Sequence, residues 1–288
     1  MISWLNILIL GLVQGAAELL PVSSSAHVIV TEKLMGIDPA GPQAMFILAM
    51  LHTGTMFSVI VYFWTAWKET FFSSTQKFYT MAWRAAVATM ITGVVGYGPI
   101  MVIEKVFLRH TNTGDIEELS SNLFLIGAAM AVAGIWIIVA GVRRSDRSEG
   151  GGQPISLRVA AWMGFSQGLC LPFRGLSRSG ATISTALLAN ANRRRAEEFS
   201  FAMAVIITPA VIVRESLRLR KAYPEAIQNG TIHHLVMPGL FGLVAAFVSG
   251  LLALRLLSSW LENGNWRYFG YYCLTAAVAV FGLHAAGY

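Results

Sequence analysis

Two short polar runs interrupt stretches of chain that are otherwise apolar enough to lie in a lipid bilayer. The first reads Pro21-Val-Ser-Ser-Ser-Ala-His27, and the second reads Gly175-Leu-Ser-Arg-Ser-Gly-Ala-Thr182. Hydroxyls, an arginine and a histidine at membrane depth each cost free energy unless they are paired or solvated. The two runs therefore indicate a buried polar cavity, and they are where the sequence predicts function.

The first run follows a carboxylate. Glu18 lies one helical turn after Gln14, on the same face, and we assign the other fourteen of the fifteen acidic residues to loops and ends. Glu18 could bind a metal, act as a base or orient a base, or it could only snorkel to the interface. Ser24 and His27 are also one turn apart, and a serine with a histidine is the minimum set for activated nucleophilic attack. His52 could reach the same cavity, but we favour a structural role for it.

The second run centres on Arg178. Hydroxyls and a glycine surround it, at Ser177, Ser179, Gly180 and Thr182. A cation with hydroxyls and backbone amides at the start of a helix is typical of a phosphate site. The alternative is a structural arginine that pairs with Glu18 and neutralises both charges.

The elements that position these residues are membrane helices, because 55% of the residues are hydrophobic and only 12% are charged, against about 25% charged in a soluble domain. Two stretches, 3–35 and 159–190, are split by the polar runs into halves too short to span, which is typical of re-entrant hairpins. We therefore expect an all-α polytopic membrane protein with about six transmembrane helices and two re-entrant helical hairpins. The six predicted spans are 44–67, 80–103, 122–142, 199–214, 234–257 and 267–287.

The chain repeats itself at an offset of 153 residues. The matched pairs include Gly11 with Gly164, Gln14 with Gln167, Gly15 with Gly168 and Ser24 with Ser177. Three predicted spans separate the two copies, and because three is odd, the second copy enters the membrane from the opposite side. We expect a single integral membrane domain over 1–288, built as an inverted repeat of 1–147 and 155–288 joined by a linker at 148–154.

Basic residues predict the orientation. Eleven lysines and arginines fall on the side of the linker and seven on the other, which favours a cytoplasmic linker and both termini outside. The remaining three, Arg84, Arg174 and Arg178, fall within apolar segments, and we expect Arg84 to snorkel toward its helix end. The formal charge of +6 fits anionic lipid headgroups, so nucleic acid is not expected as a partner.

In these motifs the chain resembles the undecaprenyl-diphosphate phosphatases of the bacitracin-resistance type, and the match spans most of its length. One signature of that family is a Glu/Gln-x-x-x-Glu motif running into Pro-Val-Ser-Ser, present here as Gln14-Gly-Ala-Ala-Glu18-Leu-Leu-Pro-Val-Ser-Ser24. The other is a Pro-Gly-x-Ser-Arg-Ser-Gly-Ala-Thr motif, present here from Arg174 to Thr182. The stretch from Glu198 to Phe201 also looks like the family's segment after the second motif.

The resemblance implies removal of the terminal phosphate from a C55 polyprenyl diphosphate, which recycles the lipid carrier for cell-wall synthesis and confers bacitracin resistance. It implies a bacterial cytoplasmic membrane protein whose site faces the outer side. Ser24 would attack the phosphorus, with His27 or Glu18 taking its proton and Arg178 stabilising charge; Ser23 and His27 remain alternative nucleophiles. The resemblance also implies that the chain needs a divalent cation, Mg²⁺ or Ca²⁺, for which Glu18 is the expected ligand. The residues expected to bind substrate are Gln14, Ser23, Ser25, Arg174, Ser177, Ser179, Gly180 and Thr182.

Two positions depart from the family pattern. Arg174 replaces the first proline of the second motif, and Gln14 stands where many members have a glutamate. Arg174 adds a positive charge and Gln14 removes a negative one, so the site is more positive by about two charges. We therefore expect phosphate binding to depend more on arginine and less on metal. A different reading of the same architecture is a polyprenyl-phosphate flippase, because inverted repeats with paired hairpins are typical of transporters. A homodimer is an assembly that the sequence leaves open.

Overall fold

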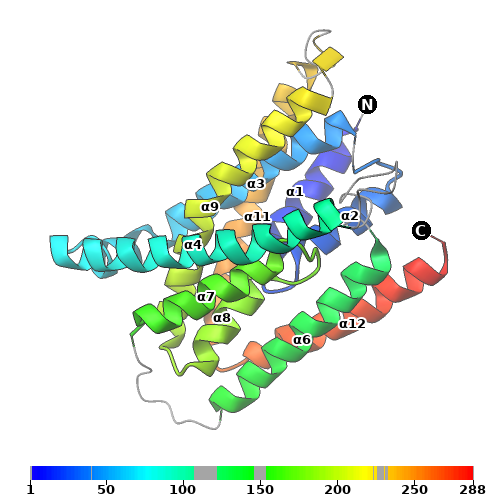
Figure 1. The fold of residues 1–288 in the computed structure, drawn as a ribbon. Helices are drawn as coiled ribbons and strands as arrows, with labels where there is room; N and C mark the ends of the chain where they lie inside the picture. The colour runs from blue at the N-terminus through cyan, green and yellow to red at the C-terminus, as the bar shows by residue number, and fades with distance from the viewer. Residues whose placement is uncertain are drawn as a thin grey trace. The chain divides into compact units, whose positions relative to one another are not determined.

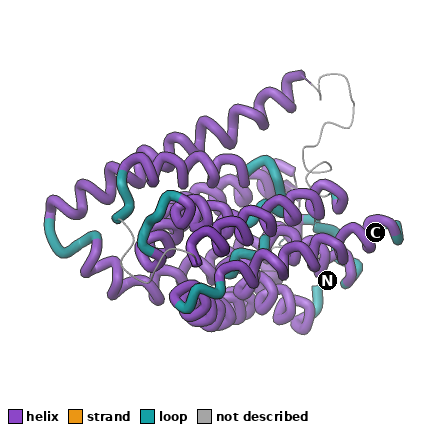
Figure 2. The backbone as a smooth tube through the Cα atoms, turned by 90° about the horizontal axis from the view of Figure 1, so that it is seen from below, coloured by secondary structure: helices purple, strands orange, loops and turns teal. Residues whose placement is uncertain are grey.

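A computed structural model describes residues 2–39, 41–106, 122–145, 154–222, 224–225, 230 and 233–287, and every structural statement below refers to them. The chain is helical throughout these ranges, and no strand is assigned in them (Figures 1 and 2). The helices of the first half are α1 (Trp4–Leu19), α2 (Ser24–Leu34), α3 (Pro42–Thr70), α4 (Thr75–Val106) and α6 (Leu123–Ser145). Those of the second half are α7 (Leu157–Cys170), α8 (Arg178–Leu188), α9 (Arg193–Ala222), the short η2 (His233–Leu235), α11 (Val236–Glu262) and α12 (Trp266–Ala285). Most of the predicted linker, 148–153, lies outside the described residues.

Six of the described helices are long and apolar enough to cross a membrane. They are α3, α4, α6, α9, α11 and α12, so the expectation of a multi-pass membrane protein with six spans is confirmed. The prediction placed the fourth span at 199–214, but α9 already begins at Arg193. That start was missed because its first turns are charged, and the structure pairs those charges with one another, as described below.

The two interrupted stretches each form two short helices joined by a tight connection. The first gives α1 and α2, of 16 and 11 residues, and the second gives α7 and α8, of 14 and 11 residues. A span requires about 20 residues, so none of these four helices crosses a bilayer alone. In each pair the two helices contact one another. The hairpins are therefore present as helix pairs, while their position in a bilayer stays a prediction.

The chain divides into two compact units, and each combines segments from both halves of the sequence. The first unit contains 1–19, 24–64 and 204–257, and the second contains 20–23, 65–203 and 258–288. The core of the first unit packs buried side chains of α1, α2, α3 and α11, which are Ile7, Leu10, Val28, Ile47, Leu51 and Ala246. In the second unit α6 and α12 run side by side, and α4 contacts α7 (Figure 1).

Glycines on α1 and α7 allow the same kind of close helix contact in both units. In the first unit, a Cβ on Gly15 of α1 would lie 2.7 Å from the Cβ of Ser249 on α11. In the second unit, a Cβ on Gly168 of α7 would lie 2.7 Å from the Cβ of Val95 on α4. Gly15 and Gly168 are 153 residues apart, the offset at which the sequence repeats. Helices that approach this closely need glycine at the contact.

Alanine at either glycine is expected to destabilise the protein. The added methyl has no room at Gly15 or Gly168, and overpacking of this kind costs about 1–3 kcal/mol. The matched control is Gly93→Ala on α4, where a Cβ would meet nothing within 4 Å and alanine favours the helix. Thermal unfolding in detergent should show lower midpoints for Gly15→Ala and Gly168→Ala than for Gly93→Ala. Equal midpoints for the three variants would contradict the close contacts.

Candidate active site

The first motif brings a carboxylate and a serine hydroxyl into direct contact. α1 ends at Leu19, the turn 20–23 reverses the chain, and α2 begins at Ser24. The hydroxyl of Ser24 donates a hydrogen bond of 2.5 Å to Oε2 of Glu18. A carboxylate at this distance can take the proton of an attacking hydroxyl. Of the two bases left open by the sequence, the structure therefore places Glu18 against the serine oxygen.

The turn owes its shape to an unusual backbone at Ser23. This residue is buried and has a φ of 70°, in the left-handed region that few residues other than glycine adopt. Such a conformation costs on the order of 1–3 kcal/mol and persists only where the surroundings hold it. The backbone amide of Val22 also donates to the carbonyl of Leu20 at 2.9 Å. This left-handed residue lies directly before Ser24, where α2 begins.

Two further side chains contact the same carboxylate. Gln14, buried one turn earlier on α1, donates from Nε2 to Oε2 of Glu18 at 3.4 Å, in the i, i+4 relation that the sequence predicts. Nε2 of His52, on α3, lies 3.9 Å from the same oxygen. The other ring nitrogen of His52, Nδ1, is 2.9 Å from the carbonyl oxygen of Leu48. Because a carbonyl only accepts, Nδ1 carries a hydrogen, and Nε2 faces the carboxylate as a group that can receive a proton.

His52 therefore belongs to the candidate site, although the sequence favoured a structural role for it. The contact joins α3 to α1 across many residues of chain, and no local spacing reveals it. We expect His52→Gln to lower kcat by about tenfold, the lower end of what a proton-accepting or orienting group contributes. The matched control is His234→Gln, because His234 is exposed and belongs to neither motif. An unchanged pH profile and rate in His52→Gln would exclude the role.

The other predicted residues of the first motif lie on α2 or just before it. Ser25 and His27 are half-buried on its first turn, and the carbonyl of His27 accepts a hydrogen bond from Thr31. Ser23, buried in the turn, precedes them. Contact of these three residues with a substrate stays a prediction, as does the choice of nucleophile among Ser24, Ser23 and His27.

The second motif forms a loop that ends in the first turn of α8. Ser177 is the N-cap of this helix, and its side chain accepts a hydrogen bond of 3.2 Å from the amide of Gly180. Gly175 has a φ of +105°, and a Cβ there would lie 2.5 Å from the carbonyl oxygen of Ile126 on α6. Only glycine fits this position, because both the space and the backbone exclude a side chain. Arg178 is consequently held at the N-terminus of α8, where the helix dipole also favours an anion.

Hydroxyls of α8 attach the second motif to its surroundings. Ser179 donates to the carbonyl of Leu20 at 3.2 Å, and Thr182, fully buried, shares a hydrogen bond of 2.6 Å with Ser200 on α9. The segment 20–23 belongs to the second unit, and the thiol of Cys273 also donates to its Pro21 carbonyl at 3.3 Å. The second motif thus supports the turn that stands between Glu18 and Ser24 in the sequence. Arg174 and Arg178 are both half-buried.

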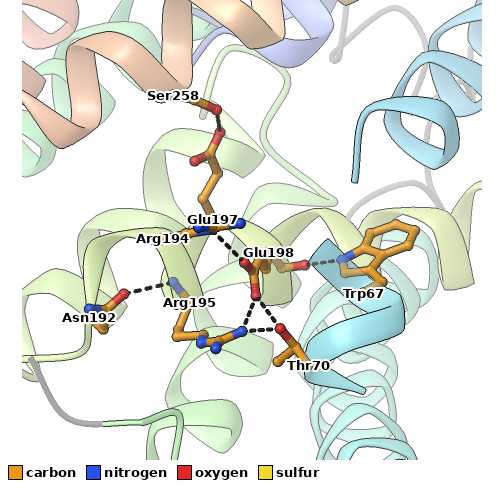
Figure 3. A network of polar contacts seen from close by, with 8 residues as sticks. All are labelled: Trp67, Thr70, Asn192, Arg194, Arg195, Glu197, Glu198 and Ser258. Carbon is orange, nitrogen blue, oxygen red and sulfur yellow. Dashed lines mark hydrogen bonds and ion pairs between the residues drawn. The ribbon is translucent and has the colours of Figure 1, made fainter. Parts of the chain in front are cut away.

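Sequence reasoning missed the buried carboxylates of α9. It assigned every acidic residue except Glu18 to loops and ends, but Glu197 and Glu198 lie in a membrane-spanning helix and are each 1% exposed. Glu198 is paired with Arg195 at 2.7 Å and with Arg194 at 3.1 Å, as Figure 3 shows. Its i−3 and i−4 neighbours were the available signal, since arginines at that spacing neutralise a carboxylate on the same face.

Glu197 points the other way and accepts a hydrogen bond of 2.5 Å from Ser258 (Figure 3). Trp67 donates its indole N–H to the backbone carbonyl of Glu198, and Asn192 caps the first turn by accepting from the amide of Arg195. This network fixes the charged start of α9. It involves residues of neither motif, so it lies outside the candidate active site.

The candidate site offers oxygen ligands to a cation. Among the described residues, no three histidines, cysteines or acidic residues gather as a metal cluster. Glu18 nevertheless stands beside the hydroxyl of Ser24 and the amide group of Gln14. Mg²⁺ is commonly bound through one or two carboxylates, with substrate phosphates and water completing its shell. The donor set fits such an ion, provided that the substrate supplies the remaining ligands.

The chain is similar to known proteins over nearly its whole length. The chain matches the family described as "Bacitracin resistance protein BacA" over residues 7–279. It is 52% identical over 283 residues to "Undecaprenyl-diphosphatase 2" of Acinetobacter baylyi, with 97% of each chain covered. It is 31% identical over 279 residues to an "Undecaprenyl-diphosphatase" of Parabacteroides distasonis, covering 96% of each. A relative of the same name from Korarchaeum cryptofilum is 28% identical over 286 residues, covering 96% of this chain and 97% of that one.

Proposed function

Since the chain belongs to the BacA family of bacitracin resistance proteins, we propose that it removes the terminal phosphate from undecaprenyl diphosphate. The observation that carries the proposal is the hydrogen bond from Ser24 to Glu18, a nucleophile and a base in contact within a membrane protein. A lipid substrate explains why such a pair is set among apolar helices. The prenyl tail can stay in hydrocarbon while the diphosphate meets the polar residues. The product would be the lipid monophosphate that serves as carrier in cell-wall synthesis.

In the proposed reaction, Oγ of Ser24 attacks the terminal phosphorus and its proton passes to Oε2 of Glu18. The new Ser24 O–P bond forms as the bond from phosphorus to the bridging oxygen breaks, and the lipid phosphate leaves with the electron pair. Glu18 returns its proton to the leaving group and then takes a proton from a water whose oxygen bonds to the phosphorus as the Ser24 O–P bond breaks. Oγ of Ser24 takes that proton back from Glu18, and inorganic phosphate leaves. His52 would orient Glu18 and share its proton, because Nε2 faces the carboxylate.

The second motif would hold the diphosphate. Arg178 supplies a planar cation whose donors match phosphate oxygens, at a helix end that itself favours anions. Negative charge develops on the bridging oxygen as the phosphoryl group is transferred, and a fixed cation stabilises that charge. The hydrogen bond from Ser179 to the carbonyl of Leu20 attaches this motif to the turn that precedes Ser24 in the sequence.

A divalent cation belongs to the proposal as well. Glu18, with Ser24 and Gln14 beside it, would hold Mg²⁺ or Ca²⁺ together with the diphosphate oxygens. When bound, the ion would neutralise phosphate charge. Removal of divalent ions by a chelator would then weaken substrate binding more than it weakens folding.

We further propose the inverted repeat and its place in the cell. The order of described helices in the first half matches the order in the second, from α1 with α7 to α6 with α12, and the paired glycine contacts support the equivalence. The excess of basic residues on the linker side supports a cytoplasmic linker with both termini outside. With the family resemblance, we propose an active site on the outer face of the cytoplasmic membrane. A homodimer also stays a prediction, and a measurement of the molecular mass of the protein in detergent would test it.

Phosphate release from undecaprenyl diphosphate and from farnesyl diphosphate, measured with purified protein in detergent, tests the function. We expect release that stops when Ser24 is replaced by alanine. Lipid movement in vesicles without phosphate release would favour the flippase instead. Trapping the intermediate separates the nucleophiles, because phosphoserine survives acid and is lost in base, whereas phosphohistidine is lost in acid.

Arg174 offers a separate test of how the chain departs from its family. It lies half-buried in the loop before α8, where the family pattern has proline, and it adds a cation beside Arg178. We expect Arg174→Pro to raise KM by about tenfold, the effect of one lost charge-assisted contact, and to increase the dependence on added Mg²⁺. Steady-state kinetics at several Mg²⁺ concentrations measures both the KM for the substrate and the dependence of activity on Mg²⁺. Unchanged affinity together with an unchanged metal requirement would remove the hypothesis.

A further inference from the structure

The second unit contains a cavity of about 400 Å³ that neither motif lines. It lies where the end of α3, the first half of α4, the segment before α7 and the start of α9 meet. Three of its lining residues are cationic, namely Lys77, Arg84 and Arg195, and Glu69 is the one acidic residue among those that line it. The cavity is therefore positively charged overall. It also lies on the side of the linker, which the sequence predicts to be cytoplasmic.

Arg84 is the cation that needs an explanation. It stands nine residues after Thr75 in a membrane-spanning helix, roughly 13 Å along the helix axis, and it faces the cavity. Within the part of the chain that the structure describes, it makes no ion pair and no side-chain hydrogen bond. An arginine at such a position without a carboxylate partner is expensive unless it faces water or a ligand. Snorkelling alone does not account for a guanidinium that lines a cavity.

Arg195 presents a second set of donors to the same space. Its Nη1 contacts Glu198 at 2.7 Å and also contacts the hydroxyl of Thr70, as Figure 3 shows. The ion pair with a buried carboxylate holds the guanidinium in place, and its contacts with described side chains all pass through Nη1. The remaining N–H groups are therefore oriented by the protein and contact no side chain among the described residues. A positioned fork of this kind suits the oxygens of a phosphate.

The rest of the lining suits an amphiphile. Hydroxyl and amide groups come from Thr80 and Gln76, and apolar walls come from Phe71, Met81 and Ile155. Basic pockets between membrane helices on the cytoplasmic side recognise lipid headgroups through the same combination. A volume of about 400 Å³ holds a phosphate with the first atoms of the group that carries it.

We propose that this cavity is a second phosphate-binding site, separate from the catalytic one, which takes a phosphate monoester on a lipid or free phosphate. Arg84 and Arg195 bind the phosphate oxygens, Lys77 adds charge at the rim, and the apolar wall accommodates the chain of a lipid. The site goes beyond the proposed hydrolysis, because none of its residues belongs to either motif.

Binding of dioleoyl phosphatidic acid, followed by native mass spectrometry in detergent, tests the proposal. The measurements use Arg178→Ala as the background, so that the catalytic site does not contribute. We expect Arg84→Gln to weaken binding by about tenfold, as for one lost charge-assisted contact, and Arg84→Lys to restore part of it. The matched control is Arg158→Gln, because Arg158 is exposed on α7 and does not line the cavity. Equal losses in Arg84→Gln and Arg158→Gln would show diffuse surface attraction and overturn the proposal.

Two comparisons identify the source of the phosphate. Dioleoylglycerol, which lacks the phosphate, is expected not to bind. If inorganic phosphate binds as tightly as phosphatidic acid, the site takes free phosphate; if the lipid binds more tightly, the site takes a lipid. With Arg178 intact, Arg84→Gln should keep the wild-type rate of phosphate release, which also shows that it folds. Loss of that rate would assign Arg84 to catalysis and contradict a separate site.

Discussion

Replacing Glu18 with glutamine is expected to lower kcat by at least about a hundredfold while leaving the fold intact. Glutamine keeps the size of the side chain and can still contact Ser24, but it cannot take a proton. Phosphate release from undecaprenyl diphosphate in detergent measures the loss. The control is Glu225→Gln, because Glu225 is exposed and belongs to neither motif. A Glu18→Gln enzyme with the wild-type kcat would exclude the carboxylate as the base.

A double-mutant cycle strengthens this test. Ser24→Ala alone is expected to cost on the order of a thousandfold or more in kcat, as for other nucleophiles. If Ser24 and Glu18 act as one unit, the double variant should be no slower than the slower single variant. Multiplicative losses would mean that the two residues act independently, which their hydrogen bond of 2.5 Å argues against.

Replacing Arg178 with alanine is expected to lower kcat/KM by about a thousandfold, the scale of an arginine that stabilises a transferring phosphoryl group. Lysine at this position should recover only part of the loss, because an ammonium lacks the planar fork that binds two phosphate oxygens. Steady-state kinetics with undecaprenyl diphosphate separates a change in KM from one in kcat.

Arg143→Ala provides the matched control, since Arg143 is exposed on the last turn of α6 in the same unit as Arg178. A comparable decrease in both variants would point to loss of net positive charge near the membrane. Full activity of Arg178→Lys would mean that charge alone matters and that the geometry of α8 does not.

Much of the fold follows from the sequence because membrane helices can be recognised by their length and their apolar composition. Each of the six spans was predicted, and the interrupted stretches became helix pairs broken at Ser23 and Gly175, where the backbone adopts left-handed angles. The start of α9 was missed, because a window of apolar residues cannot anticipate charges that neutralise one another within the helix. Predicting the start of α9 would have required knowledge of the ion pairs that Arg194 and Arg195 make with Glu198.

The candidate site was predictable only in part. Gln14, Glu18 and Ser24 lie close in the chain, so helical spacing and a tight turn are enough to relate them. His52 comes from another helix, and its 3.9 Å separation from Glu18 depends on how α3 packs. Arg84 shows the same limit, since the sequence placed it near a helix end but could not show the cavity beside it. Contacts between distant segments need the packing, which spacing does not contain.

The glycine contact between α1 and α11 also determines how late in synthesis α1 can complete its packing. Gly11 would place a Cβ 2.8 Å from that of Ala245, and the two residues are 234 positions apart in the chain. At a synthesis rate of about 5–20 residues per second, α1 waits on the order of ten to fifty seconds for its partner. During that time the helix that carries Glu18 lacks the surface that it packs against in the finished protein. The surface that supports the helix carrying Glu18 is thus completed late, after most of the chain has been synthesised.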